Sequence, residues 1–121
     1  MGDVIKRNTV FMECMTMKDI TAFAAGEMVS VCRIENKWVT QESNGKYFRI
    51  DSSFLRKDEF FKINKQYSMS DIIYYLMDRN ANYQTVAWEF LEEAVLTAFK
   101  EMRFYGATLN DIYNYIPDYL I

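Results

Sequence analysis

Short apolar runs separated by turn residues characterise the first half of the chain. Val, Ile, Phe, Cys and Thr dominate these runs, as is typical of β-strands. Gly26 accepts a left-handed backbone, so residues 17–25 before it are expected to form a short helix or turn. Glu35-Asn36 predicts a tight turn, and residues 52–57 predict another turn or short helix. Strands are therefore expected at residues 9–15, 28–34, 38–42, 46–51 and 59–64, in a small antiparallel meander or half-barrel.

The dipeptide Asn44-Gly45 is the strongest turn signal in the chain, because both residues tolerate the positive φ angles of a type I′ hairpin. A two-residue loop here pairs Ser43 with Lys46, and every later pair follows from that register. The register predicts one mainly apolar face, which we assign to the core, and one aromatic-basic face. The core face would carry Val39, Gln41, Phe48 and Ile50, and the other face Trp38, Thr40, Tyr47 and Arg49.

The second half of the chain repeats its apolar residues at helical spacing. Ser68 and Ser70 are candidate N-caps of a first helix, with Asp71 in its first turn and residues 80–82 at its end. The apolar residues that predict this helix are Met69, Ile72, Ile73, Leu76 and Met77.

A longer helix is expected over residues 84–104, with Gly106 as its C-cap. Thr108 and Asp111 have the spacing of a capping box for a final helix over residues 109–116. The long helix carries one apolar stripe, Ala87, Leu91, Ala94, Val95, Ala98 and Met102, widened by Trp88 and Phe99.

Residues 92–120 resemble the first two helices of a winged-helix domain: a helix, a glycine-containing turn and a capped helix with an Ile-Tyr pair. In that family such a unit helps to bind DNA. The second helix here carries Asn110, Asp111 and Asn114 but no Lys or Arg, which disfavours phosphate contacts. A helical hairpin that closes the core is the simpler interpretation.

Together these patterns predict an α+β fold in a single domain, a small antiparallel sheet followed by a three-helix C-terminal part packed on it. The hydrophobic period changes near Gln66, and so does the charge. Residues 1–66 hold 11 Lys and Arg against 9 Asp and Glu, a net +2, whereas residues 67–121 hold 3 against 8, a net −5. No apolar run approaches the roughly 18 residues of a membrane span. The N-terminus lacks the apolar core of a secretory signal, so a cytoplasmic location is expected.

The composition excludes several kinds of chemistry. The chain has no histidine, so it cannot build the common Ser-His or Cys-His nucleophile pairs. Its two cysteines, Cys14 and Cys32, are too few for a zinc site without histidine and are expected to be free, buried strand residues. The four glycines are too far apart for a dinucleotide-binding loop. We therefore expect no catalytic residue, no metal, no cofactor and no enzymatic activity.

Trp38, Tyr47 and Arg49 are one candidate ligand face, with further basic residues nearby. Aromatic and basic residues interleaved on a sheet are typical of surfaces that hold single-stranded nucleic acid by stacking and phosphate contacts. Alternatively, Trp38 and Tyr47 pack under the C-terminal helices. The first possibility makes the protein a small nucleic-acid or nucleotide-binding module.

The acidic, tyrosine-rich second half is the other candidate, and it indicates protein binding. Tyrosine is enriched at protein interfaces, and surface carboxylates favour a basic partner. The candidate contact residues are Glu89, Glu92, Glu93, Asp111 and Tyr113. The leading expectation is a small non-catalytic cytoplasmic protein that binds another macromolecule stoichiometrically, of the immunity-protein or phage-encoded host-defence-inhibitor type.

Overall fold

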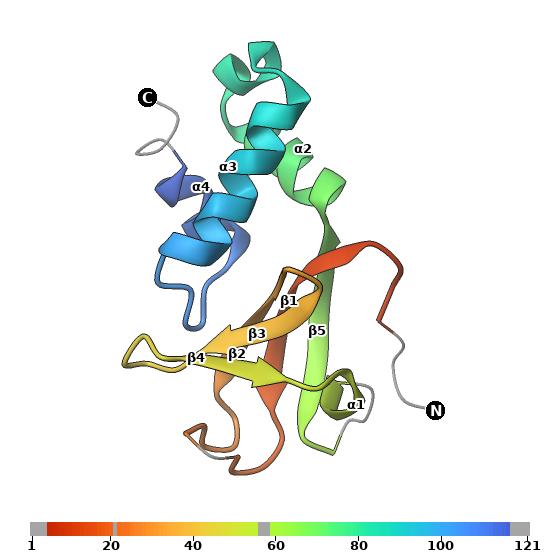
Figure 1. Ribbon diagram of the computed structural model, residues 1–121, viewed down its shortest axis with the longest axis vertical. Coiled ribbons are helices and arrows are strands. Elements are labelled where there is room, and N and C mark those ends of the chain that lie inside the picture. The colour runs from red at the N-terminus through yellow and green to blue at the C-terminus, as the bar shows by residue number, and fades with distance from the viewer. Residues whose placement is uncertain (1–4, 21, 56–58, 117–121) are drawn as a thin grey trace.

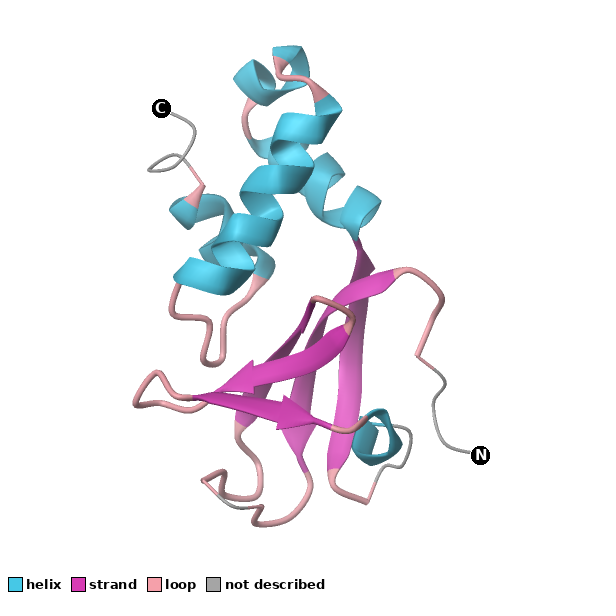
Figure 2. Ribbon diagram, in the orientation of Figure 1, coloured by secondary structure: helices cyan, strands magenta, loops and turns pink. Residues whose placement is uncertain are grey.

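The computed structural model describes residues 5–20, 22–55 and 59–116. They form two layers, an antiparallel sheet from the first half and a helical layer from the second half (Figure 1). Figure 2 shows how completely strands and helices are segregated, apart from one short helix beside the sheet. The predicted α+β class, with the sheet first and the helices after it, is confirmed. Among the described residues, no helix has both the length and the apolar character needed to cross a bilayer.

Five strands make up the sheet, in the spatial order β4-β3-β2-β1-β5. Every neighbouring pair is antiparallel, and the ladder between β1 and β5 contains two irregularities. The last strand reaches the edge beside β1 after a connection that contains the short helix α1 (Ser52–Leu55). The strands are β1 (Thr9–Thr16), β2 (Met28–Ile34), β3 (Lys37–Gln41), β4 (Tyr47–Ile50) and β5 (Phe61–Ser68).

The hairpin between β2 and β3 closes in a two-residue turn at Glu35-Asn36. Both residues have positive φ angles, 51° and 65°, and Ile34 lies opposite Lys37. These are the features of a type I′ turn, whose twist matches that of the flanking strands. The predicted tight turn is confirmed, and it is this hairpin that has the type I′ geometry.

The predicted register at Asn44-Gly45 is wrong by one residue. Glu42 lies opposite Lys46, and its N–H donates to the Lys46 carbonyl at 2.9 Å, so the loop has three residues. The Gly45 N–H donates to the Glu42 carbonyl at 2.8 Å, and Gly45 alone has a positive φ, 89°. This is a type I turn followed by a glycine bulge. The Asn44 Oδ1 atom accepts a hydrogen bond from the Lys46 N–H at 2.8 Å. This bond stabilises the three-residue loop and does not require a positive φ angle at Asn44.

This shift of one residue regroups the side chains of β3 and β4. Trp38 lies opposite Ile50 and Thr40 opposite Phe48, so the expected pairing of Val39 with Ile50 does not form. Because side chains alternate across a strand, the two predicted faces are each half wrong. One face carries Trp38, Thr40, Phe48 and Ile50, and the other carries Val39, Gln41, Tyr47 and Arg49.

Apolar residues pack on both faces of the sheet. Phe11 and Cys32 belong to the larger core, between the sheet and the helices, whereas Met12 and Cys14 belong to a second core on the opposite face. Leu55 of α1 contributes to the second core. Both cysteines are free and fully buried on strands, as predicted. Burial raises the pKa of the Cys14 thiol to about 12.

The helical layer contains α2 (Met69–Arg79), a 3-10 turn η1 (Ala81–Thr85), α3 (Trp88–Glu101) and α4 (Leu109–Tyr115). Thr108 and Asp111 form the predicted capping box. The long helix begins later than predicted because η1 occupies residues 81–85, and it ends at Glu101, so Gly106 lies in the following loop rather than at a C-cap. The expected end of the short helix at residue 57 lies outside the described residues.

No linker separates the two layers. Ser68 is the last residue of β5 and also the N-cap of α2, where it forms a capping box with Asp71. The strand therefore passes directly into the helix, two residues beyond the predicted seam at Gln66.

Three hydrogen bonds join the sheet to α3 and the loop after it. The Gln41 Oε1 atom accepts the Phe104 N–H at 2.6 Å. The Ser30 hydroxyl donates to the Ala107 carbonyl at 2.5 Å, and the Tyr47 hydroxyl donates to the Lys100 carbonyl at 2.6 Å. These hydrogen bonds satisfy one backbone group in the last turn of α3 and two in the loop after it, and each of these groups would otherwise lack a partner.

Candidate binding surfaces

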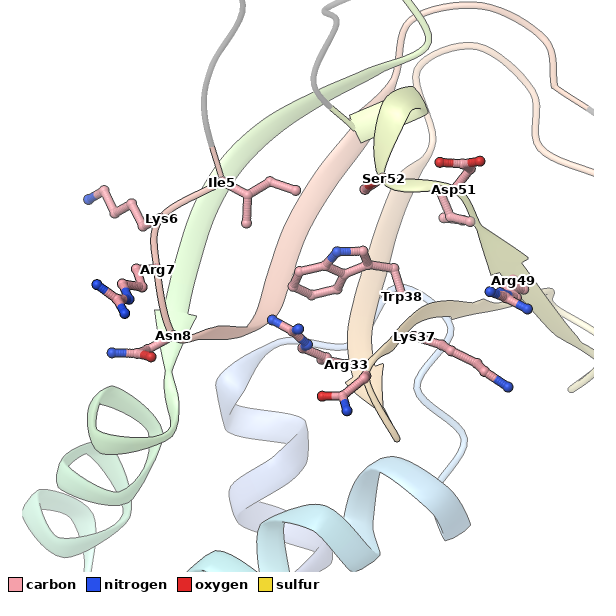
Figure 3. Close-up of a pocket in the computed structure, with 12 residues that line it drawn as sticks. Ile5, Lys6, Arg7, Asn8, Arg33, Lys37, Trp38, Arg49, Asp51 and Ser52 are labelled. Carbon is pink, nitrogen blue, oxygen red and sulfur yellow. The ribbon is translucent and has the colours of Figure 1, made fainter.

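A hollow of about 720 Å³ opens beside the hairpin of β2 and β3 (Figure 3). Segments far apart in the sequence line it: residues 5–8 ahead of β1, the hairpin itself, the end of β4 and the start of α1. We call it the basic pocket, after the residues that give it its character: Lys6, Arg7, Arg33, Lys37 and Arg49, around Trp38.

Trp38 lies at the centre of the basic pocket in Figure 3. Arg33 is its partner across the hairpin, and the Arg33 guanidinium carbon lies 5.5 Å from the indole centroid. This distance is within the range of a cation–π contact. Trp38 is half-buried because its other contacts are with the second core. The pair therefore lines the charged hollow, with Trp38 supported by the second core.

The remaining cations lie on the two sides of this pair. Lys6 and Arg7 lie on one side of the indole in Figure 3, and Lys37 and Arg49 on the other. Within the described part of the chain, no carboxylate lies at ion-pair distance from any of these four or from Arg33. The pocket thus concentrates positive charge that the described residues do not neutralise.

Asp51 is the single carboxylate among the described residues that line the pocket. Its Oδ1 atom accepts the Ser53 N–H at 3.1 Å, in the first turn of α1. This side chain therefore has a local structural role at the start of α1, and the lining keeps a formal charge of +4.

Tyr47 and Arg49 lie on one face of the sheet and Trp38 lies on the other, contrary to the predicted aromatic-basic face. Arg49 lines the pocket with Trp38 because β4 is an edge strand. Tyr47 lies on the helix side of the sheet, where its ring packs 5.9 Å from that of Phe104. Burial there raises the pKa of its hydroxyl. The structure separates the two aromatic residues: Tyr47, which stays 45% exposed, contacts Lys100 and Phe104, and Trp38 lines a pocket on the other face.

The sequence interpretation missed the contributions of Lys6, Arg7 and Arg33 to this pocket. One signal for Arg33 was present, because a two-residue loop at Glu35-Asn36 places Arg33 directly opposite Trp38. No local signal marks Lys6 and Arg7, since only the long-range pairing of β1 brings residues 5–8 to the hairpin.

The outer surface of α3 is the second candidate. Glu89 and Glu93 are exposed and Glu92 is half-buried beside them. The side chains of Phe90 and Leu96 are also exposed, by 62% and 42%, on the same helix. On the neighbouring α2, Tyr74 is 57% exposed and its ring lies 5.6 Å from that of Trp88. Trp88 and Phe90 are two residues apart on α3, so they lie on different sides of this helix. We call Glu89, Phe90, Glu92, Glu93 and Leu96 the acidic-apolar surface.

Asp111 and Tyr113 have local structural roles. Asp111 accepts the Thr108 N–H at 2.8 Å in the capping box of α4. The Tyr113 ring packs edge to face on Tyr83 at 6.2 Å. The predicted role of both residues in partner binding stays a prediction. The most exposed large apolar side chain of the described helices is Phe90 on α3, so the candidate surface centres there.

Among the described residues, no group of three His, Cys, Asp or Glu side chains is arranged to hold a metal ion. Comparison with protein families, curated proteins and solved structures found no match to this chain. A functional assignment therefore depends on the two surfaces described above.

Proposed function

We propose that the protein is a non-catalytic binding protein that engages a protein partner stoichiometrically through the acidic-apolar surface. The observation that carries this proposal is the 62% exposure of Phe90, a large apolar side chain in the first turns of a helix whose other face is fully packed. Such exposure at a regular, ordered position favours an interface residue.

The core does not need Phe90 or Leu96. The buried residues of α3 already fill the space between the helices and the sheet. Covering a large apolar side chain stabilises a complex by about 1.5–3 kcal/mol before the costs of association. Phe90 and Leu96 are the two candidate anchors of a small interface.

The carboxylates of Glu89, Glu92 and Glu93 determine the kind of partner. They stand beside the apolar residues on α3, in a half of the chain with a net charge of −5. This arrangement favours a partner with a basic rim around an apolar hollow, because opposite potentials raise the association rate. A cytoplasmic inhibitor or immunity protein, which blocks a basic target by occupying it, is the class that best suits such a surface.

The test is affinity capture from the source cell, or from its host, with quantitative comparison of variants. Phe90→Ser should lose a captured protein that the wild-type chain retains. Phe54→Ser, which alters an exposed phenylalanine on α1, is the matched control and should retain it. The captured protein is then purified and titrated, and a one-to-one end point is expected.

Equal capture by wild type and Phe90→Ser would contradict the proposal, provided both variants melt cooperatively. So would a partner whose binding depends on Phe54 rather than Phe90.

A further inference from the structure

The basic pocket is separate from the acidic-apolar surface, and the protein-binding proposal does not explain it. Arg7, Lys37 and Arg49 are exposed, and the described residues give their side chains no hydrogen bond or ion pair. Like charges gathered around one hollow repel one another. An anionic ligand would relieve that repulsion.

Arg33 and Trp38 add a feature that a simple phosphate site does not need. The Arg33 guanidinium carbon lies 5.5 Å from the indole centroid, and the described residues accept no hydrogen bond from the guanidinium N–H groups, which can donate to a phosphate oxygen or a base edge. Planar guanidinium and indole groups are surfaces on which nucleic-acid bases stack. The ligand therefore combines negative charge with a planar ring.

The positions of the cations distinguish a nucleotide chain from a free nucleotide. Lys6 and Arg7 lie on one side of Trp38, and Lys37 and Arg49 lie on the other, where they project from the helix-side face at the hairpin and the edge strand (Figure 3). A nucleoside triphosphate has its phosphates at one end, so it would leave one pair of cations unused. A single strand has phosphates on both sides of each base and matches both pairs.

We propose that the basic pocket binds single-stranded nucleic acid, with one base at the Trp38–Arg33 pair and flanking phosphates near the cations on each side. A volume of about 720 Å³ is sufficient for a nucleotide-sized group. The overall acidity of the chain is not an obstacle, because the excess negative charge belongs to residues 67–121 and the lining carries +4.

The test is fluorescence anisotropy with dye-labelled oligothymidine and oligouridine, each about twelve nucleotides long, at low salt. Arg33→Gln should weaken binding at least roughly tenfold. Arg79→Gln is a matched control, because Arg79 also lies over an aromatic ring, 4.7 Å from the centroid of Tyr75, but on α2. It should bind like the wild type.

Salt dependence tests the phosphate contacts. For single strands, each phosphate contact contributes about 0.7 to the slope of log affinity against log salt. The double variant Arg7→Gln/Lys37→Gln should therefore reduce that slope by about 1.4. Arg7 and Lys37 are exposed, so the variant should melt at the wild-type temperature, which checks its folding.

Tryptophan emission tests stacking directly. In a Trp88→Phe background Trp38 is the one remaining tryptophan, and the oligonucleotide should quench its fluorescence. No binding of either oligonucleotide would overturn the proposal, as would equal binding by Arg33→Gln and Arg79→Gln. A nucleoside triphosphate that competes at lower concentration than the oligonucleotide would also overturn it. None of these results alters the Phe90 test of protein binding.

Discussion

Gln41 is the side chain on which the contact between sheet and helices most clearly depends. It is 4% exposed, and its Oε1 atom accepts the buried Phe104 N–H at 2.6 Å. Its Nε2 atom donates to the Gly45 carbonyl at 3.2 Å. The Gln41 side-chain amide therefore satisfies a backbone N–H of the loop after α3 and also stabilises the glycine bulge of the hairpin.

Gln41→Ala removes both hydrogen bonds and leaves the Phe104 N–H buried without a partner. An unsatisfied buried N–H costs about 1–3 kcal/mol, and the second hydrogen bond contributes about 0.5–1.5 kcal/mol. The expected loss in free energy of unfolding is roughly 2–4 kcal/mol. For a chain of this size the melting temperature should fall by roughly 10 °C.

Calorimetry measures that loss, and amide hydrogen exchange shows where it arises. In Gln41→Ala the Phe104 amide should lose more protection than the global loss of stability accounts for. Gln84→Ala is the matched control, because Gln84 is exposed and makes one hydrogen bond, to the Met77 carbonyl at 3.4 Å. It should change stability by less than about 0.5 kcal/mol. Equal melting temperatures for the two variants, with Phe104 protection unchanged, would refute this account of Gln41.

Gly45, Glu27 and the two cysteines provide the remaining tests. Gly45→Ala places a side chain at a φ of 89° and should cost about 1–2 kcal/mol in a denaturant titration; a neutral effect would contradict the assigned turn. Hydrogen bonds from the Tyr105 hydroxyl and from the Ala24 backbone N–H lower the pKa of the Glu27 carboxyl group. The ionised carboxylate therefore stabilises the folded protein above the ordinary carboxyl pKa, and this stabilisation is lost as the pH falls through the lowered pKa of Glu27. Tyr105→Phe should raise the Glu27 pKa in an NMR titration. An unchanged pKa would show that the hydrogen bond from Tyr105 is not the main cause of the lowered value. Burial raises the pKa of Cys14 and Cys32, so a thiol reagent at a pH of about 8 should label both only after unfolding, and rapid labelling of the native protein would contradict their burial.

Local signals predicted the helices well. Thr108 and Asp111 form the expected capping box, and Ser68 rather than Ser70 is the N-cap of α2. These contacts lie within one turn of the chain, so sequence spacing is sufficient to find them. The start of α3 was less predictable, since residues 84 and 85 fit both a helix and the 3-10 turn that they adopt.

The register of the second hairpin could not be found in this way. An Asn-Gly pair is compatible with a two-residue turn and with a three-residue loop that ends in a glycine bulge. Gln41, Lys46 and Asn44 favour the second form through contacts that exist only in the folded hairpin. The same limit applies to the basic pocket, because Lys6 and Arg7 reach it only after β1 has paired with β2.

The direct passage of β5 into α2 at Ser68 affects how the molecule can be dissected. Cutting the chain at this residue would expose one whole side of the sheet, where Phe11 and Cys32 pack under the helices. It would also free α2 from the strand that fixes its direction. Residues 11 and 12 face opposite cores, so β1 belongs to both layers at once. Expressed alone, the halves should therefore be poorly soluble, whereas co-expressed fragments should reassemble through β1 and its neighbours.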